Sequence, residues 1–407
     1  MPTAFVSDTG ALDDPLVEYS FGSPLVQNIP TVCTQDGKSH ENGYLRLPPI
    51  ETTLALLQVF FEDFNCVFPL FDRTSFMALV NQKYTRDRGD DPVWWGALSV
   101  VLSLSLQLHA MSTFNRDTTT VDDQKAWNYL NNALSVVPDL TARDADLLGV
   151  QTLLGMAIIL QGTHNPHPAS VLIAAAVKLS HSLGLHRKTA NAKLEDVSSE
   201  QRNRIFWIVY ILDKDYSLQL DQPPMLRDDD MDIEVPSENP EDGLGFISDA
   251  NEDLRINFFR LRVHLAIIED KIYSRLYSVR ALKQSEQSRT HVVQDLDRVL
   301  DRWKEGVPHP FRPGNMIASL PKGSISHIVI LHLRFYDCLT MVHGVAFQNE
   351  DWMITAMQPE NEEKQASLSC PSQGICIKST RESLKLVRLL PQGDYACIWC
   401  AYNLPAI

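Results

Sequence analysis

Apolar residues recur every three or four positions along almost the whole chain from residue 50 onward. Residues 51–64, ETTLALLQVFFEDF, place Leu54, Leu57 and Phe64 on one side of an α-helix, the pattern of a helix with one buried face. Residues 92–111, PVWWGALSVVLSLSLQLHAM, are apolar on nearly every side and predict a helix deep in the core. No stretch alternates convincingly as a strand would, and no internal repeat is present. The predicted class is all-α, a multi-helix, bundle-like domain.

Some predicted helices have recognisable ends. Pro168 suits a first helical turn, and Gly184 suits the left-handed residue that follows a last one. In the preceding apolar stretch, ADLLGVQTLLGMAIILQG, the small residues Gly149, Gly155 and Ala157 would let a neighbouring helix approach closely.

Later segments continue the helical pattern. Ser198 and Gln201 have the spacing of a capping box, so a helix is expected from about Ser199 to about Leu220. An acidic loop should follow over 228–249, and then a long helix whose apolar residues run from Leu254 to Val279. That helix could pack within the domain or along a partner. Further amphipathic helices are expected over 292–303, 326–347 and 375–390.

Composition limits the kinds of partner. The 407 residues carry a formal net charge of −15, with 51 Asp and Glu against 36 Lys and Arg, so the chain as a whole repels a phosphate backbone. Residues 1–49 mix Pro, Gly, Ser and Asp with little periodicity and are expected to form a flexible linker before a domain over 50–407. We find no membrane segment and no secretory signal, and the seven cysteines at irregular spacing favour a reduced, intracellular protein.

The search for catalytic and metal-binding motifs gives weak candidates only. No nucleophile elbow, P-loop, dinucleotide fingerprint or H-E-x-x-H is present. Four histidines, which could be metal ligands, are more often residues of a loop and of a helix end: His164, His167, His181 and His186. Cys397 and Cys400 form a lone C-x-x-C that favours buried thiols. The acidic run with Asp228, Asp229, Asp230, Asp232 and Glu234 lacks the glycine and final glutamate of an EF-hand loop and favours a solvated loop.

The stretch from residue 206 to 226, FWIVYILDKDYSLQLDQPPML, places a charge at the end of a buried run. Asp213 follows eight apolar residues and would need a cation or backbone donors to remain charged. Arg187 and Arg204 are the candidate partners by proximity in the chain. No second acid, base or nucleophile accompanies Asp213, which favours a structural pin over a catalytic acid.

In order, these segments resemble a known family. FEDFNCVFPLFDRTSF, DPVWWGALSVVLSLSLQLHA, DLLGVQTLLGMAIILQGTHNP, ASVLIAAAVKLSHSLGLHRK and RNRIFWIVYILDKDYSLQLDQPPMLRDDDMDIEVP are similar to successive parts of the fungal-specific transcription factor domain, the middle homology region of Zn2Cys6 binuclear-cluster regulators. The resemblance covers residues 50–345, with weaker detail after that. The family-motif residues, to which it gives a structural role, are Phe206, Trp207, Asp213, Lys214, Pro223, Gly184, His186 and Arg187.

Two positions depart from the family pattern. Lys214 stands where an arginine is usual, which keeps the charge but loses the planar fork. Asp221 and Gln222 stand where Gly-Arg is usual before Pro223, so a tight turn or ion pair that the family builds there is put in question.

The resemblance implies a nuclear regulator of transcription that forms homo- or heterodimers with family members, contacts the transcription machinery and senses a small-molecule effector. Family members read DNA through six cysteines with C-x2-C-x6-C spacing that hold two zinc ions, whereas only Cys33 precedes Cys66 here. We therefore expect no cofactor or metal in this chain, no membrane contact, and DNA contact only through a module outside these residues. The regulatory domain could also be truncated at its C-terminal end.

Three hypotheses remain. The zinc cluster could be encoded upstream of Met1, or the protein could be a clusterless relative that acts by protein contacts alone, for example by dimerising through the helix predicted from Leu254 to Val279. The third is an all-α enzyme that uses His164, His167, His181 or Asp213. The first is favoured, and the third, which would require a metal, is the least supported.

Overall fold

The computed structural model describes residues 45–86, 90–112, 116–161, 167–188, 196–251, 253–315, 320–345 and 371–390. The chain divides into two compact units, residues 1–43 and 44–407, and every described residue belongs to the second. Of the predicted linker only residues 45–49 are described. Leu47 is buried, and its backbone N–H donates to the carbonyl of Arg86 at 3.0 Å. This short stretch is thus held in place, and the linker before it stays a prediction.

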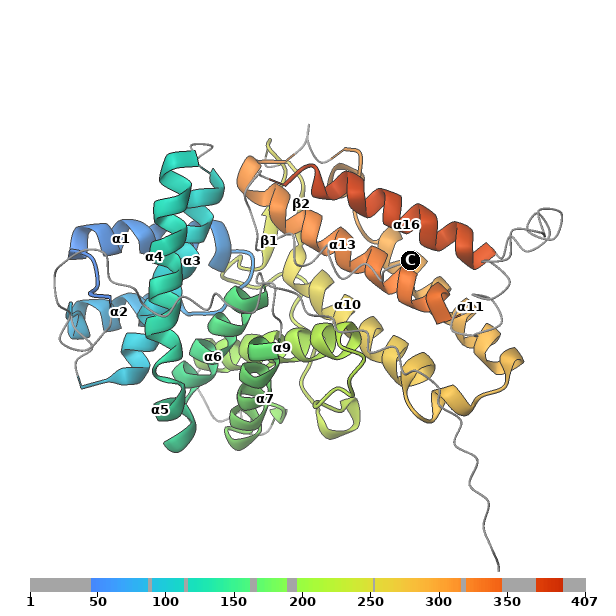
Figure 1. Ribbon diagram of the computed structural model, residues 1–407, viewed down its shortest axis with the longest axis horizontal. Helices are drawn as coiled ribbons and strands as arrows, with labels where there is room; N and C mark the ends of the chain where they lie inside the picture. The colour runs from blue at the N-terminus through green and yellow to red at the C-terminus, as the bar shows by residue number, and fades with distance from the viewer. Residues whose placement is uncertain are drawn as a thin grey trace, which may run out of the picture. The chain divides into compact units, whose positions relative to one another are not determined.

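Helices make up nearly all of the described chain, which confirms the all-α class (Figure 1). The helices are α1 (Ile50–Val59), α2 (Arg73–Lys83), α3 (Pro92–Ser112), α4 (Arg116–Leu134), α5 (Val137–Ala142), α6 (Leu147–Gln161), α7 (His167–Ser182), α9 (Asp196–Gln219), α10 (Phe258–Ile272), α11 (Glu286–Glu305), α13 (Lys322–Gly344) and α16 (Pro371–Val387).

Two clusters of buried apolar side chains form the interior. The first lies among α1 to α7 and α9, and the second among α10, α11, α13 and α16. Helix α10 belongs to both, since Val263 and Ala266 pack in the first cluster and Leu265 and Ile268 in the second. Figure 1 shows α9 and α10 in the middle of the described unit, between the blue-green helices and the orange-red ones. These two helices are therefore the place where the two clusters meet.

Glycine allows two core helices to approach, as predicted for one of the small residues. A Cβ added at Gly155 of α6 would collide with Cγ1 of Val100 on α3. Gly149 serves a different purpose: its backbone N–H donates to the Asp146 carboxylate, 2.6 Å away, which caps the start of α6. Close approach at Gly155 is thus a condition for the α3–α6 contact.

Helix ends follow the predictions unevenly. Gly184 closes the turn after α7 with a positive φ of 67°, as expected. Helix α9 begins at Asp196, three residues before the predicted start, so Ser198 and Ser199 lie inside it. Capping-box spacing is a short pattern that recurs by chance, and the continuous packing of α9 carries the helix past it.

The helix predicted from Leu254 to Val279 starts too early. Residues 255–257 form strand β2 (Arg255–Asn257), which pairs antiparallel with β1 (Phe246–Ser248), and α10 begins only at Phe258, where the Asn257 side chain caps it. At the other end a π-helical turn, Tyr273–Tyr277, continues α10, and Val279 lies beyond it with an exposed side chain. Three-residue strands are too short to show alternation, which is why the sequence did not indicate them.

Helix α13 is long and apolar. Its residues Ser324–Gly344 are long and apolar enough to cross a membrane by length and composition, but most of that stretch is buried among other helices of the domain. It packs against α10, α11 and α16 and carries the buried polar residues His332 and Arg334. These features are those of a core helix.

Candidate functional site

The predicted motif residues lie on α9 and on the loop that follows it. The apolar run Ile205–Leu212 is buried on all sides, because α6, α7 and α10 pack around α9. Arg204, Trp207, Tyr210 and Asp213 recur at intervals of three along α9, and their polar groups bind the loop 221–245, which returns along the helix. This loop is called the return loop below.

Asp213 is satisfied by backbone donors. Its buried carboxylate accepts hydrogen bonds from the N–H groups of Met225 at 3.0 Å and Leu226 at 2.9 Å, directly after the Pro-Pro pair. Burial raises the pKa of Asp213, while Lys214 and these two N–H groups act in the opposite direction. The need for backbone donors was predicted, but neither predicted arginine contacts this carboxylate.

Lys214 binds the same loop residue, Leu226, as Asp213 does. Its buried ammonium donates to the carbonyl of Leu226, forms an ion pair with Asp270 of α10 at 2.7 Å, and lies 4.8 Å from the centre of the Tyr210 ring. Asp213 and Lys214 therefore hold both the N–H and the C=O of Leu226, which is itself buried. We call this arrangement the Leu226 clamp.

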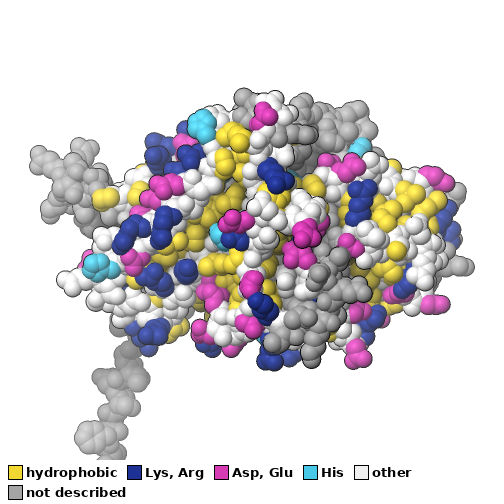
Figure 2. All heavy atoms as spheres, turned by 180° about the vertical axis from the view of Figure 1, so that it is seen from behind, with side chains coloured by type: hydrophobic (Ala, Val, Ile, Leu, Met, Phe, Trp, Pro, Cys, Tyr) yellow, Lys and Arg dark blue, Asp and Glu magenta, His cyan; other side chains and the backbone are white. Residues whose placement is uncertain are grey.

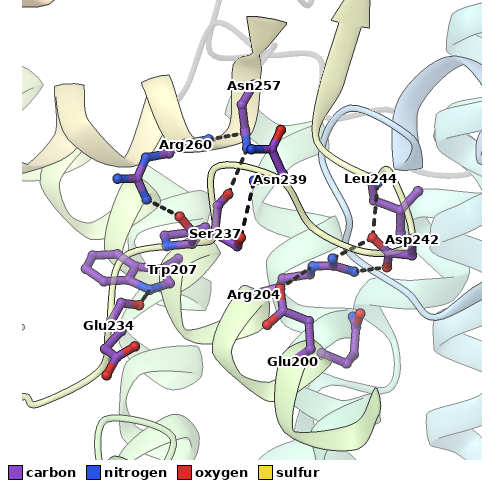
Figure 3. A network of polar contacts seen from close by, with 12 residues as sticks. Glu200, Arg204, Trp207, Glu234, Ser237, Asn239, Asp242, Leu244, Asn257 and Arg260 are labelled. Atoms are coloured by element: carbon purple, nitrogen blue, oxygen red, sulfur yellow. Dashed lines mark hydrogen bonds and ion pairs between the residues drawn. The ribbon is translucent and has the colours of Figure 1, made fainter. Parts of the chain in front are cut away.

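Arg204 and Trp207 of α9 hold parts of the return loop that lie farther along the chain (Figure 3). Arg204 forms a two-pronged bond with Asp242, at 2.6 and 2.8 Å, and an ion pair with Glu200 at 3.2 Å. The Trp207 indole N–H donates to the carbonyl of Glu234 at 2.8 Å. Arg204 is thus a partner of the loop and not of Asp213, which corrects the prediction.

The return loop is fastened from the side of α10 as well. The Asn257 amide donates to the carbonyls of Ser237 and Glu238, at 2.9 and 3.1 Å, and Arg260 donates to the carbonyl of Pro236 (Figure 3). The acidic loop predicted to be solvated is therefore docked along much of its length, although Asp228, Asp229 and Asp230 have exposed side chains. Its backbone groups find partners on two helices, which composition could not indicate.

The turn after α7 contacts the same loop. The carbonyl of His186 accepts from the N–H of Asp232 at 3.2 Å, and the Asp232 carboxylate accepts from the N–H of Lys188 at 2.7 Å. Arg187 is exposed and bonds through its N–H to the carbonyl of Gly184. The turn after α7, which contains Gly184 and His186, and the polar residues of α9 thus contact the same loop.

Two of the four histidines weighed as metal ligands lie together. His181 and His186 meet edge to face, with ring centres 4.9 Å apart, and burial together with His181 lowers the pKa of His186. Within the described residues no three His, Cys, Asp or Glu side chains lie close enough to hold a metal ion, and His164, Cys397 and Cys400 fall outside those residues.

A second group of charges lies on the opposite side of α9 and was not predicted. Asp215 binds Arg262 of α10 at 2.6 and 2.7 Å, and Arg334 of α13 lies 4.0 Å away. Glu269 lies 3.9 Å from Arg262, and Asp337 lies 3.7 Å from Arg334. These five residues, which we call the seam cluster, sit where α9, α10 and α13 meet.

The three carboxyl groups of the seam cluster differ in the direction in which their pKa is shifted. Burial alone would raise the pKa of Asp215, but Arg262 and Arg334 outweigh it, so this pKa lies below its ordinary value. Burial and the charge of Asp215 raise the pKa of Glu269 well above its ordinary value. Burial also raises the pKa of Asp337 to about 7. The cluster is a balanced set of buried charges.

Comparison with known proteins now decides the family. The profile of the Fungal specific transcription factor domain matches residues 57–305. This range contains α9 with its motif and α10, the two helices at which the core clusters meet. The chain belongs to this family.

Curated relatives agree. The chain is 42% identical over 363 residues to the ABC-transporter-regulating transcription factor of Aspergillus oryzae and 40% identical over 363 residues to that of Aspergillus fumigatus; each match covers 88% of this chain and 40% of the relative. It is 26% identical to the Fusaridione A cluster transcription factor fsdR of Fusarium heterosporum, over 85% of this chain and 63% of that protein. The chain thus spans about two fifths of the length of the first two, and it is a transcription-regulator domain of fungal type.

The departures from the family pattern have visible consequences. At residue 214 a single lysine nitrogen is enough, because it serves one carbonyl and one carboxylate. Asp221 adopts a positive φ of 50° after the end of α9, and the N–H of Gln222 bonds to the carbonyl of Ser217 at 2.9 Å. A tight turn is therefore made here with an aspartate, a residue that tolerates the left-handed region.

Proposed function

We propose that this chain is the regulatory domain of a nuclear transcription factor that controls the expression of ABC-transporter genes. The observation that carries the proposal is the 42% identity over 88% of this chain to an ABC-transporter-regulating transcription factor. Identity at that level over most of a domain preserves its fold and its core residues, so the same regulatory role is the expectation for both proteins.

DNA contact is assigned to a module outside these residues. The net charge of −15 opposes binding to a phosphate backbone, and these residues lack the cysteine spacing of the family's zinc cluster. In this proposal the helical domain acts through dimerisation, an effector and the transcription machinery, and no enzymatic step is involved. The contacts of Asp213 support the last point, because both of its carboxylate oxygens are committed to backbone N–H groups.

The motif residues have an architectural role in this proposal. Phe206 and Trp207 fill the core, Asp213 and Lys214 hold Leu226, and Pro223 precedes the clamped residues. Fastening of the return loop to α9 and α10 gives this part of the domain a defined surface.

The proposal is tested by deleting the gene in the fungus that encodes it and sequencing total RNA. Transcripts of one or more ABC-transporter genes should change several-fold, and efflux of a fluorescent transporter substrate should change in the same direction. Re-introduction of the wild-type gene restores both, and a fluorescent fusion should concentrate in the nucleus. Unchanged transporter transcripts across growth with and without toxic compounds would contradict the assignment of target genes.

DNA binding by the 407-residue chain is tested separately. Fluorescence anisotropy with labelled duplex DNA at physiological salt should show no binding stronger than the non-specific range, about 10⁻⁴ to 10⁻⁶ M. Tight, sequence-dependent binding by the purified chain would contradict the assignment of DNA contact to another module.

A further inference from the structure

Helix α16 and the residue that follows it, Arg388, carry an exposed seven-residue repeat. Ile377-Lys378 is followed after two residues by Arg381, and Leu384-Lys385 is followed after two residues by Arg388. Side chains seven residues apart lie on the same side of a helix, about 10.5 Å apart along its axis. The repeat therefore places two apolar and four basic side chains in one stripe.

The stripe faces away from the domain. The opposite side of α16 packs on α13 through Cys376, Ser379, Ser383 and Leu386, all of them buried, and the two helices lie side by side (Figure 1). Ile377 and Leu384 are 39% and 54% exposed, which is unusual for large apolar side chains at regular spacing. The stripe is thus not required by the packing of α16 on its own domain.

The charges of the stripe are largely uncompensated. Among the described residues, Lys385 pairs with Glu382 at 2.7 Å, whereas Lys378, Arg381 and Arg388 form no ion pair with any of them. The imbalance extends beyond α16. The described residues from 253 to 390 contain 18 Lys and Arg against 10 Asp and Glu, while those from 45 to 251 contain 14 against 26.

The space-filling view agrees with this division. In Figure 2, which shows the molecule from behind, Lys and Arg side chains gather on the left, the side on which α11 lies after the half-turn from Figure 1. A basic region on a chain of net charge −15 attracts acidic partners locally although the whole chain repels them.

We propose that the outer stripe of α16 binds an acidic amphipathic helix of another protein. The partner presents large apolar residues seven positions apart to Ile377 and Leu384, and flanks them with Asp or Glu that face Lys378, Arg381, Lys385 and Arg388. The partner segment must be a helix, because side chains seven residues apart on one helix are matched by side chains seven residues apart on another. A nucleic acid would use the cations but would leave the two exposed apolar side chains without a role. This inference does not depend on which genes the protein controls.

The test uses the full 407-residue chain and two synthetic fluorescent peptides. One peptide is a helix of about four turns with Leu and Glu in the matching seven-residue pattern. The other has the same composition in scrambled order, so that charge is equal and only the stripe is lost. The patterned peptide should bind at least about tenfold more tightly than the scrambled one, measured by anisotropy at physiological salt.

Variants of the stripe separate its two components. Arg381→Glu with Arg388→Glu should weaken binding of the patterned peptide by at least about tenfold, and Ile377→Ser with Leu384→Ser by a similar factor. The control is Arg280→Glu with Lys283→Glu, which changes the net charge equally at exposed positions between α10 and α11 and should leave binding unchanged. All of these positions are exposed, and equal melting temperatures would verify the fold.

Four results would overturn the proposal. Two concern the peptides: equal affinity for the patterned and scrambled peptides, or an equal loss of peptide affinity in the control variant. The third is binding of duplex DNA that is tighter than peptide binding and depends on Arg381 and Arg388 alone. The fourth is a dimer of the wild-type chain, seen by light scattering without peptide, that the Ile377/Leu384 variant loses. A fourth variant neutralises the five acidic residues between 346 and 370. If this change alone raises peptide affinity, the chain's own acidic segment is the occupant and the partner proposal fails.

Discussion

Asp213 and Asp215 are two residues apart on α9 but face opposite sides of it, because two helical positions correspond to a rotation of about 200°. Asp213 faces the return loop and accepts two backbone N–H bonds. Asp215 faces α10 and α13 and is neutralised by two arginines in the seam cluster. The first carboxylate fixes the path of a loop, and the second joins three helices of the core.

The comparison shows that the kind of donor decides how easily a buried carboxylate loses its partners through substitution. Backbone N–H groups carry no net charge and are lost only on substitution by proline. The guanidinium of Arg262 can be removed by any substitution, and Asp215 would then keep only Arg334 as a nearby cation, 4.0 Å away. The seam cluster is consequently the more sensitive of the two sites to substitution of a partner.

The largest effect is expected for Arg262→Ala. Loss of the buried guanidinium should lower the free energy of unfolding by about 3 to 5 kcal/mol, measured by urea denaturation, because the buried Asp215 carboxylate loses its nearest cation. Arg275→Ala is the matched control, since Arg275 forms an exposed pair with Asp295 at 3.0 Å and should cost about 1 kcal/mol or less. Equal effects of the two substitutions would show that the seam cluster contributes no more than a surface pair.

Asp213→Ala is expected to cost about 2 to 4 kcal/mol, because the N–H groups of Met225 and Leu226 lose their acceptor and Lys214 loses a carboxylate 3.8 Å away. Asp213→Asn should cost nearly as much, since an amide offers only one acceptor atom. Amide hydrogen exchange at Leu226 should accelerate in both variants. Asp229→Ala, an exposed substitution in the same loop, should remain within about 0.5 kcal/mol of wild type. Unchanged melting together with lost regulation in cells would reject the architectural role of Asp213.

The seam cluster should also make stability depend on pH. Because the pKa of Asp337 is raised to about 7 from 3.8, the folded state binds its proton more tightly than the unfolded state does. The contribution of Asp337 to stability is therefore complete below about pH 4 and is lost as the pH rises towards 7. Asp337→Asn should escape this loss, so its advantage over wild type should grow by about 2 to 3 kcal/mol between pH 4 and pH 7. Parallel stability curves for the two proteins would mean that Asp337 is not the titrating group.

The smallest effect concerns the turn between α9 and the return loop. Asp221 has a positive φ of 50° and an exposed side chain, so Asp221→Gly should stabilise the fold by about 0.5 to 1 kcal/mol through relief of backbone strain. Asp221→Ala should destabilise it by about 1 kcal/mol, because alanine lacks the local hydrogen bonds by which aspartate tolerates this region. A neutral or negative effect of glycine would show that the aspartate side chain itself contributes to the turn.

Much of the fold could be predicted from the chain alone. Helical periodicity is a local property, so most helices, the end of α7 at Gly184 and the close approach at Gly155 follow from the order of residues. The start of α10 does not, because the apolar spacing from Leu254 to Phe258 also suits a helix, and the pairing of residues 255–257 with β1 depends on a segment several residues upstream.

The candidate site was predicted in part. Asp213 was recognised as a buried group that needs donors, since a charge at the end of an apolar run is visible in the sequence. Its partners were misassigned to Arg187 and Arg204, because nearness along the chain is a poor guide to nearness across a helix. The seam cluster was missed for the same reason: Arg262 and Arg334 lie 47 and 119 positions from Asp215, and nothing local marks them as its partners.

Periodicity and turn chemistry by themselves predict an all-α domain, and the motifs in their order give the resemblance to the fungal regulator family, because each of these properties is expressed over a few neighbouring residues. Which charges meet is decided only when the helices pack. The rotation of α9 sends Asp213 to one side and Asp215 to the other, and the folded chain then supplies backbone donors to the first and arginines to the second. Ion pairs and caps between distant segments depend on the geometry of packing, and that geometry is a property of the whole domain.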